Sequence, residues 1–275
     1  MKKLILGVFA MANILAVSAQ NSTSGRGEEG SGMTNKASVL VIPFESKMYM
    51  SDIDRALGEA NELNFQDIKA KFRAALDREI FIALKPYYKP LSFYAIEPQE
   101  SRAELGYIYN SIGYKYEVVP QEEVVKKENK AKKLIGKFKK KEKEEKYIEA
   151  GIQGGQIVSQ VDNREKYMKT TLPNEKLLPN LNQKYQASHY IFINQLDIKR
   201  SADMRYVASE EQYKREIKVH YTIYDNAGKE VSSGAIKSRF SSNQNDMDKI
   251  IKVQFPLIAQ RIVSNLLGPD AVVAK

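Results

Sequence analysis

The chain has 275 residues, of which 43% are hydrophobic and 28% charged, with no cysteine, no tryptophan and a formal net charge of +9. This length corresponds to one large domain or two small ones, and the ordinary apolar fraction excludes a wholly disordered chain, a collagen and a multi-span membrane protein. The lack of cysteine excludes disulfides, thiolate catalysis, zinc–thiolate sites and a thioether-linked lipid anchor.

Residues 1–19 contain the three parts of a secretory signal peptide. They are a start with two lysines, an apolar stretch over 4–17 and the small-residue cleavage site Val17-Ser18-Ala19. The 14 residues of the apolar stretch are fewer than the ~20 that a membrane-spanning helix needs. We therefore expect cleavage before Gln20 and an exported protein, in the periplasm or peripheral to the outer membrane. The alternative is a buried amino-terminal helix.

Residues 20–36 are rich in glycine and serine. We expect a flexible leader here, because such a segment cannot bury enough apolar surface to fold. The leader holds a G-x-G-x-x-G string at 25–30. A dinucleotide-binding fingerprint follows a strand and opens a helix, whereas this string precedes the first expected strand. We therefore predict no cofactor from it.

The first half of the domain alternates strands and helices. The apolar run 38–44 predicts a strand buried on both faces and ended by Pro43. A polar connection follows, and a helix is expected from the capping residues Asn64 and Asp67 to Lys85-Pro86. A short strand is expected over 91–96, followed by a helix that begins at a capping box of Ser101 and Glu104.

The last third predicts a helix over 177–186 and a strand over 190–198. A hairpin follows, with strands at 216–224 and 229–240, and then a helix over 247–267 that Pro256 should kink. Together these elements predict an α/β (α+β) fold, in which one mixed β-sheet packs against helices. We expect a single domain over 37–267 with a charged, partly helical insertion at about 117–160, and a tail over 268–275.

The strand "VLVIPF", the segment "ASHYIFINQLDI" and the hairpin "REIKVHYTIYDNAGKEVSSGAIKSRF" resemble one group of bacterial envelope α/β domains. The group includes the periplasmic domain of the curli secretion pore subunit, the lipoprotein activators of penicillin-binding proteins and the amino-terminal domain of the Tol translocation protein. The resemblance covers roughly 37–112 and 177–267. It implies an accessory, docking or assembly module without catalytic residues. The curli subunit and the activators carry a lipid on a cysteine, whereas this chain has no cysteine.

The insertion carries the whole net charge of the mature chain. Residues 126–146 hold 11 lysines and 4 glutamates, a net of +7, while the rest of the mature chain is neutral. We call this stretch the lysine segment. The residues that we select as candidate contacts to an anionic surface or partner are Lys126, Lys127, Lys130, Lys132, Lys133, Lys137, Lys139, Lys140 and Lys141.

Three interpretations of the lysine segment stay open. It is a solvated loop, an electrostatic tether to anionic lipid head groups, or a docking element for an acidic partner protein. Leu134, Ile135 and Phe138 could form a small apolar stripe among the lysines, as in helices that lie in a membrane interface. A nucleic-acid-binding surface is not expected, because such surfaces spread basic residues over a face and interleave aromatic ones.

The sequence holds no recognisable catalytic or metal-binding motif. The two histidines, His189 and His220, fall within strand patterns and have no other ligand type at metal spacing, so we expect packed or solvent-facing strand residues. The acidic and amide residues at 243–248 lack the glycine and glutamate of a calcium loop and suit a helix cap instead. Seven tyrosines crowd residues 87–116, in a core or at a binding surface.

We therefore expect a non-enzymatic periplasmic accessory or docking module of a cell-envelope secretion or assembly complex. Its partner would be an envelope protein complex or an anionic membrane surface, with no nucleic acid and no metal. Two alternatives remain: a cryptic envelope hydrolase, and a structural subunit that assembles with copies of itself through sheet edges.

Overall fold

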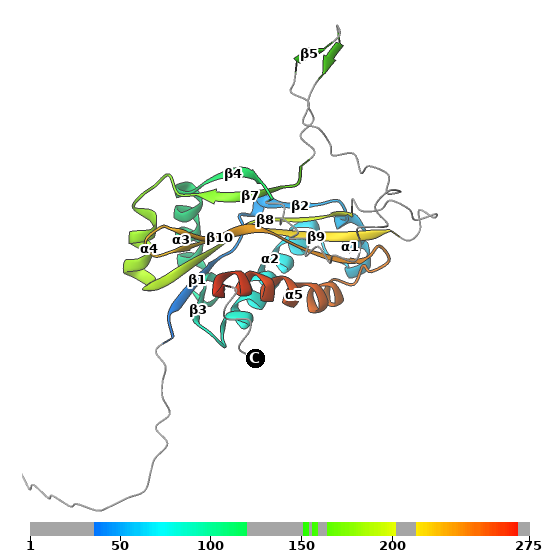
Figure 1. The fold of residues 1–275 in the computed structure, drawn as a ribbon. Coiled ribbons are helices and arrows are strands. Elements are labelled where there is room, and N and C mark those ends of the chain that lie inside the picture. Colours follow the sequence, from blue (N-terminus) through cyan, green and yellow to red (C-terminus); the bar gives the residue numbers. More distant parts are fainter. Residues whose placement is uncertain (1–35, 120–150, 154–155, 159–163, 202–212, 269–275) are drawn as a thin grey trace, which may run out of the picture. The chain divides into compact units, whose positions relative to one another are not determined.

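The structure, a computed structural model, describes residues 36–119, 151–153, 156–158, 164–201 and 213–268 (Figure 1). The expected signal peptide, leader and lysine segment lie outside these residues, as does nearly all of the expected tail. Among the described residues no helix is long and apolar enough to cross a bilayer.

A mixed six-stranded sheet forms the centre of the fold, as the sequence predicts. Its strand order is β10-β9-β8-β1-β3, and β2 pairs with β8 beyond the end of β1. β1 is parallel to β3 and β8, whereas β9 is antiparallel to both of its neighbours, β8 and β10. The strands are β1 (Ser38–Ile42), β2 (Tyr49–Ser51), β3 (Lys89–Ser92), β8 (Ala187–Arg200), β9 (Lys214–Asp225) and β10 (Glu230–Ser241).

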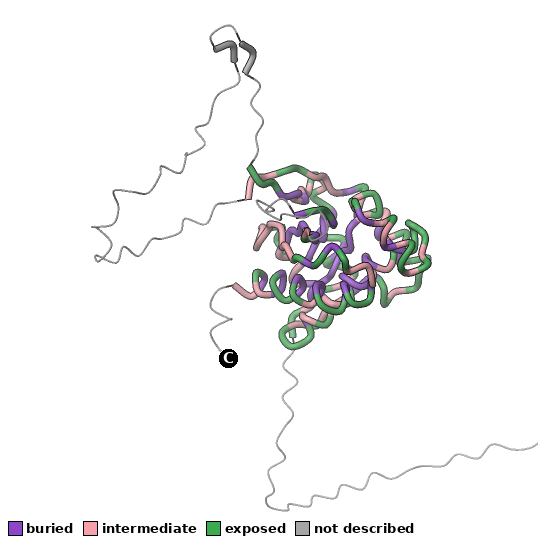
Figure 2. The backbone as a smooth tube through the Cα atoms, turned by 90° about the vertical axis from the view of Figure 1, so that its right-hand side faces the viewer, coloured by how far each residue is buried: buried purple, intermediate pink, exposed green. Residues whose placement is uncertain are grey.

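Helices cover both faces of this sheet. They are α1 (Asp54–Asn61), α2 (Phe65–Leu84), α3 (Pro98–Ser111), α4 (Leu177–Tyr185) and α5 (Met247–Leu267). Val39 and Val41 of β1 join one core cluster with α1, α2 and α5, while Leu40 and Ile42 join a second with α3 and α4. β1 is therefore buried on both faces, and the buried residues of Figure 2 lie in the interior of the domain.

Capping residues fix where the two long helices begin. The Asn64 side chain accepts hydrogen bonds from the backbone N–H groups of Gln66 and Asp67, and Asp246 accepts one from Lys249. Both helices were predicted with these caps. α5 continues through Pro256 to Leu267.

Three local expectations were wrong. The strand expected over 91–96 is β3 followed by the 3₁₀ turn η2 (Phe93–Ala95). α3 begins at Pro98 rather than at Ser101, because proline at the first helical position has a suitable φ and lacks only an N–H that would have no helical partner. The connection after β1 contains the 3₁₀ turn η1 (Ser46–Met48), β2 and α1 rather than a plain loop.

Four further strands were not predicted, and two of them form a separate ribbon. β4 (Gly113–Val118) pairs antiparallel with β7 (Lys166–Thr171), from Gly113 opposite Thr171 to Val118 opposite Lys166. β5 (Gly151–Gln153) pairs with β6 (Gln156–Val158). The segment 119–165 therefore connects the paired ends of β4 and β7, and the insertion expected from about 117 begins within β4.

Candidate functional site

All nine lysines selected from the sequence lie outside the described residues, but the structure does place the ends between which their segment runs. Val118 and Lys166 are paired at the end of the ribbon. Lys218 of β9 donates to the Lys166 carbonyl oxygen at 2.6 Å, and Glu165 lies 3.2 Å from Lys218 and 2.7 Å from Lys237. The point where the insertion leaves the fold is thus fastened to the sheet.

The ribbon is held on the sheet by side chains that bond the backbone of β7. The N–H of Met168 donates to Nδ1 of His220 at 2.8 Å, and its carbonyl oxygen accepts from Asn194 at 2.7 Å. The N–H of Thr170 donates to Oγ1 of Thr222 at 3.0 Å, and its carbonyl oxygen accepts from Tyr224 at 2.7 Å. One edge of β7 pairs with β4, and these polar side chains satisfy the other.

His220 belongs to a buried chain of hydrogen bonds below the ribbon. Its Nε2 lies 3.3 Å from Oδ2 of Asp197, whose other oxygen accepts from Gln195 at 2.5 Å. Burial lowers the pKa of His220, and Asp197 opposes this only in part. Burial acts to raise the pKa of Asp197, but the hydrogen bonds from His220 and Gln195 bring it below its ordinary value.

Both ring nitrogens of His220 are therefore used within the fold. Nδ1 accepts from a backbone amide, which requires the neutral tautomer with its proton on Nε2, facing Asp197. A ring in this state has no nitrogen left for a metal or a substrate. His189, on β8, contacts Oγ of Ser188 at 2.9 Å and packs edge-on against Tyr88. The prediction that both histidines are packed or solvent-facing strand residues is confirmed.

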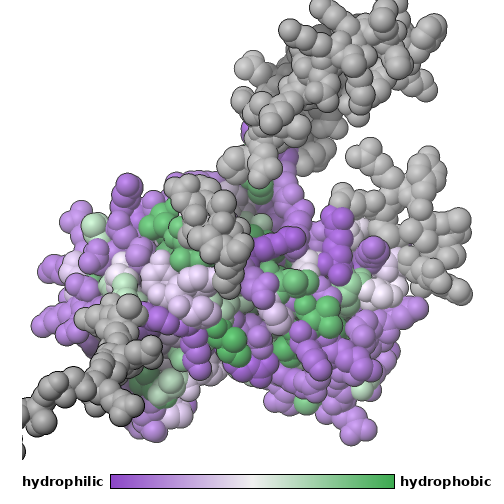
Figure 3. Space-filling model, turned by 60° about the horizontal axis from the view of Figure 1, so that its bottom comes forward, coloured by the Kyte–Doolittle hydropathy of each residue, from purple (hydrophilic) through white to green (hydrophobic). Residues whose placement is uncertain are grey.

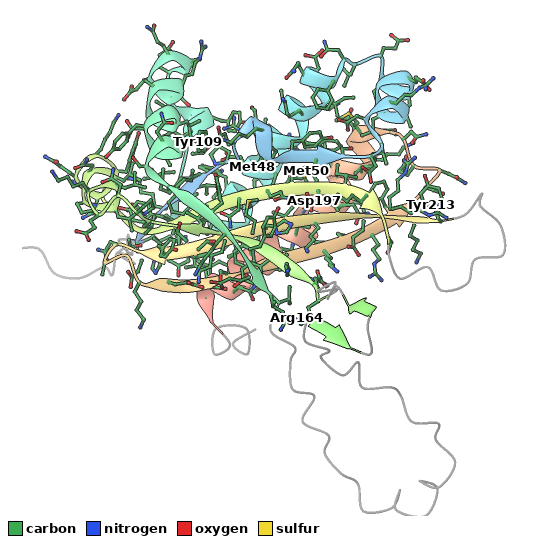
Figure 4. All side chains as sticks on the ribbon, turned by 90° about the horizontal axis from the view of Figure 1, so that it is seen from above. Met48, Met50, Tyr109, Arg164, Asp197 and Tyr213 are labelled. Atoms are coloured by element: carbon green, nitrogen blue, oxygen red, sulfur yellow. The ribbon has the colours of Figure 1, made fainter. Side chains whose placement is uncertain are left out.

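A second site lies where β1 and β3 end. The chain leaves β1 towards α2 on one face of the sheet and leaves β3 towards α3 on the other. In open α/β sheets, ligands usually bind at the carboxyl ends of two adjacent parallel strands whose connections diverge in this way, and we call this place the switch-point site. Tyr109 of α3 and Asp197 of β8 lie apart in Figure 4, so the switch-point site is separate from the buried hydrogen bonds of His220 below the ribbon.

Arg73 of α2 connects the segments that follow β1 and β3 at the switch-point site. Its Nε donates to the carbonyl oxygen of Phe44 at 2.6 Å. Its two terminal nitrogens donate to the hydroxyls of Tyr94 and Tyr109 at 3.1 and 2.7 Å. Tyr109 in turn donates to the carbonyl oxygen of Pro43 at 2.6 Å. Two of the crowded tyrosines thus serve to position this arginine.

Asp77, one turn after Arg73, is a buried carboxylate that sequence reasoning missed. It is 3% exposed, and its Oδ2 accepts from Oγ of Ser92 at 2.5 Å. Its Oδ1 is buried and has no hydrogen-bond partner among the described residues. Burial raises its pKa to about 6, against the opposing effects of Ser92 and Arg73. The only sequence signal was a charged residue inside the apolar stripe of a helix.

A cavity of about 490 Å³ adjoins Asp77. It crosses the outer side of α2 and is mostly apolar, with Ala74, Ala75, Phe81 and Ile251 in its lining. Ser92 and Tyr94 line it near Asp77, and Asp248 lines it on the side of α5. On the face of the molecule that Figure 3 shows, apolar residues form separate patches among hydrophilic ones. Within the described ranges, no three His, Asp or Glu side chains are grouped as a metal would require.

No protein-family model and no curated protein sequence matches the chain. Solved structures that are similar to it include two bacterial proteins. The lipoprotein GNA1162 from Neisseria meningitidis is 10% identical, with a TM-score of 0.34 over 82% of this chain and 98% of that one. The hypothetical protein CT253 from Chlamydia trachomatis is 12% identical, with a TM-score of 0.34 over 84% and 94%. Both are bacterial proteins, and at these scores the likeness carries no argument about function.

Proposed function

We propose that the protein is a non-enzymatic, exported docking module of a bacterial cell-envelope secretion or assembly complex. In this proposal it presents the lysine segment to an acidic surface of its partner protein. One observation carries the proposal: the segment with the whole net charge runs between two paired strands, and side chains of the sheet bind one of them. A charged segment anchored in this way has a defined origin on the domain, as a docking element requires.

The buried polar side chains below the ribbon bond the backbone of β7, which supports a structural rather than a catalytic role for them. His220, Asn194 and Thr222 direct their polar atoms to the backbone of β7. A general base needs an atom within hydrogen-bond reach of a substrate, and these atoms are already paired. The hydrolase alternative would therefore depend on Asp77, the one buried carboxylate that lines the cavity across α2.

The sheet edges give little support to the alternative of a self-assembling structural subunit. Among the described residues, β3 pairs only with β1 and β10 only with β9, so both present an edge. β3 is four residues long and contains Pro90, which cannot donate to a ladder. On β10, Arg261 already bonds the carbonyl oxygen of Lys237 at 3.3 Å, and Lys237 and Arg239 add charge. Short, proline-containing or charged edges discourage pairing with a further strand.

Affinity capture from envelope fractions tests the proposal. The bait is the intact protein, compared with the variant Lys137→Gln/Lys139→Gln/Lys140→Gln/Lys141→Gln. A matched control removes four exposed lysines elsewhere: Lys85→Gln/Lys89→Gln/Lys176→Gln/Lys252→Gln. We expect an acidic envelope protein to be captured by the wild type and the control and lost with the first variant.

Two results would overturn this function. One is the absence of any captured protein above background, and the other is equal capture by all three baits. Binding of the wild type to anionic lipid vesicles, with no protein captured, would favour the membrane tether instead.

A further inference from the structure

The cavity across α2 has a function of its own, separate from docking. We infer that it binds a small amine with an apolar body, whose ammonium group pairs with the carboxylate of Asp77. The inference rests on the position of the cavity in the fold, on its lining and on the charges around it. It does not depend on the lysine segment.

Position and size suit a small ligand. The cavity reaches Ser92 and Tyr94, immediately at the carboxyl end of β3, beside the point where the connections of β1 and β3 diverge. Its volume of about 490 Å³ falls within the range of small-molecule sites. Such sites are mostly apolar with a few convergent polar groups, and here Asp77 lies among alanine, phenylalanine and isoleucine side chains.

The charges around the cavity favour a cation. Lys71 is paired with Asp248 at 2.9 Å, and Arg78 with Glu79 at 3.0 Å. Asp77 instead receives one hydrogen bond, from the neutral hydroxyl of Ser92. Lys71 and Arg78 also line the cavity, but both are already paired with an acid, so an anionic ligand would have to compete with Asp248 or Glu79. An ammonium group would supply the charge and the hydrogen bond that Asp77 lacks.

Arg73 does not take that role. It acts electrostatically on Asp77, but its guanidinium hydrogen bonds go to Phe44, Tyr94 and Tyr109. A buried carboxylate oxygen without a donor is costly, so a ligand that supplies the donor gains affinity. Because Oδ1 is covered in the free protein, binding requires the carboxylate to rotate about its χ2 torsion, which has broad minima.

The floor of the cavity gives a way to block it without touching any charge. The small side chains of Ala74 and Ala75 leave the space of the cavity open along α2. Replacing Ala74 by leucine would place a larger apolar side chain in the space. Leucine is also a good helix former, so α2 should persist in the Ala74→Leu variant.

Ligand-observed NMR and calorimetry on the intact protein test the inference. The probe is 2-phenylethylamine, with 3-phenylpropionate and 2-phenylethanol as anionic and neutral analogues. We expect the amine to bind, the alcohol to bind at least tenfold more weakly and the acid not at all. Asp77→Asn should weaken amine binding at least tenfold, and Ala74→Leu should abolish it. The control Glu175→Gln, which changes an exposed carboxylate outside the cavity lining, should keep amine binding within twofold.

Three results would overturn the inference: no binding of the amine at 10 mM, equal binding of the three probes, or unchanged amine binding in both Asp77→Asn and Ala74→Leu. If Asp77→Asn does not fold, Ala74→Leu and the comparison of probes still decide. Because the lysine variants are not used, a failure here leaves the docking function standing, and the reverse also holds.

Discussion

His220 joins two layers of the protein by accepting the backbone N–H of Met168 on Nδ1, at 2.8 Å. β9 thereby holds β7, although the two strands do not share a ladder. The hydrogen bond that holds the ribbon at Met168 therefore depends on this ring staying neutral. The same role is played two residues further along each strand by Thr222, which accepts the N–H of Thr170.

Replacing His220 by alanine should destabilise the fold by about 2–4 kcal/mol, because the Met168 amide loses its acceptor and Asp197 loses a partner in a buried site. Amide hydrogen exchange distinguishes this loss from general loosening. In His220→Ala the Met168 amide should exchange faster than that of Thr170, and in Thr222→Val the order should reverse. Equal acceleration of both amides in both variants would show that the ribbon is not held residue by residue.

The neutral state of His220 also predicts a pH dependence. Burial keeps its folded pKa below the ordinary value of 6.5, so just below that pH the unfolded chain binds more protons than the folded one. Stability from this group is therefore present above about pH 6.5 and lost as pH falls below it. The charged groups that act on the ring are Asp197, Lys218 and Lys199.

Urea unfolding of the wild type and of His220→Gln at pH 7.5 and 5.5 measures this effect. The wild type should lose more unfolding free energy than the variant over that interval. A parallel loss in the two proteins would assign the dependence to other groups.

Asp77 predicts the opposite slope. Its folded pKa of about 6 lies above the ordinary 3.8, so between these values the folded state binds more protons than the unfolded chain. Unfolding free energy from this group should fall as pH rises from about 4 to about 6, by an amount on the order of 3 kcal/mol. The unfolding free energy of the wild type minus that of Asp77→Asn should therefore be larger at pH 4 than at pH 7.5. Denaturant midpoints at the two values check it, with Asp248→Asn as an exposed control.

The long elements could be predicted because their apolar residues recur with a clear period. α2 shows Ile68, Phe72, Leu76 and Ile80 along one side, and α5 and β9 also have a regular apolar period. The fold class followed from their order. β1 was likewise recognised from its continuous apolar run, because both of its faces are covered.

The ribbon could not be predicted from such a pattern. Thr170 is fully buried although it is polar, because its hydroxyl and its backbone groups all bond side chains of the sheet. A strand that meets the sheet through hydrogen bonds rather than apolar packing has no alternating signature. The cavity was missed for a related reason. Asp77 is a single acidic residue within the apolar stripe of α2, and its partner Ser92 ends a strand that the sequence analysis placed over 91–96.

Binding through the lysine segment should depend strongly on salt. The Debye length falls from about 10 Å at 0.1 M to about 3 Å at 1 M ionic strength, so contacts between exposed charges should be largely lost over that range. A captured partner should elute between these concentrations, and the variant Lys137→Gln/Lys139→Gln/Lys140→Gln/Lys141→Gln should release it at lower salt. The thermal midpoint should stay nearly unchanged, because substitutions on a solvated surface shift stability by less than about 0.5 kcal/mol each. If the variant unfolds, these lysines are packed into the domain and the docking proposal fails. If neither salt nor the variant changes binding, the docking surface lies on the neutral part of the chain instead.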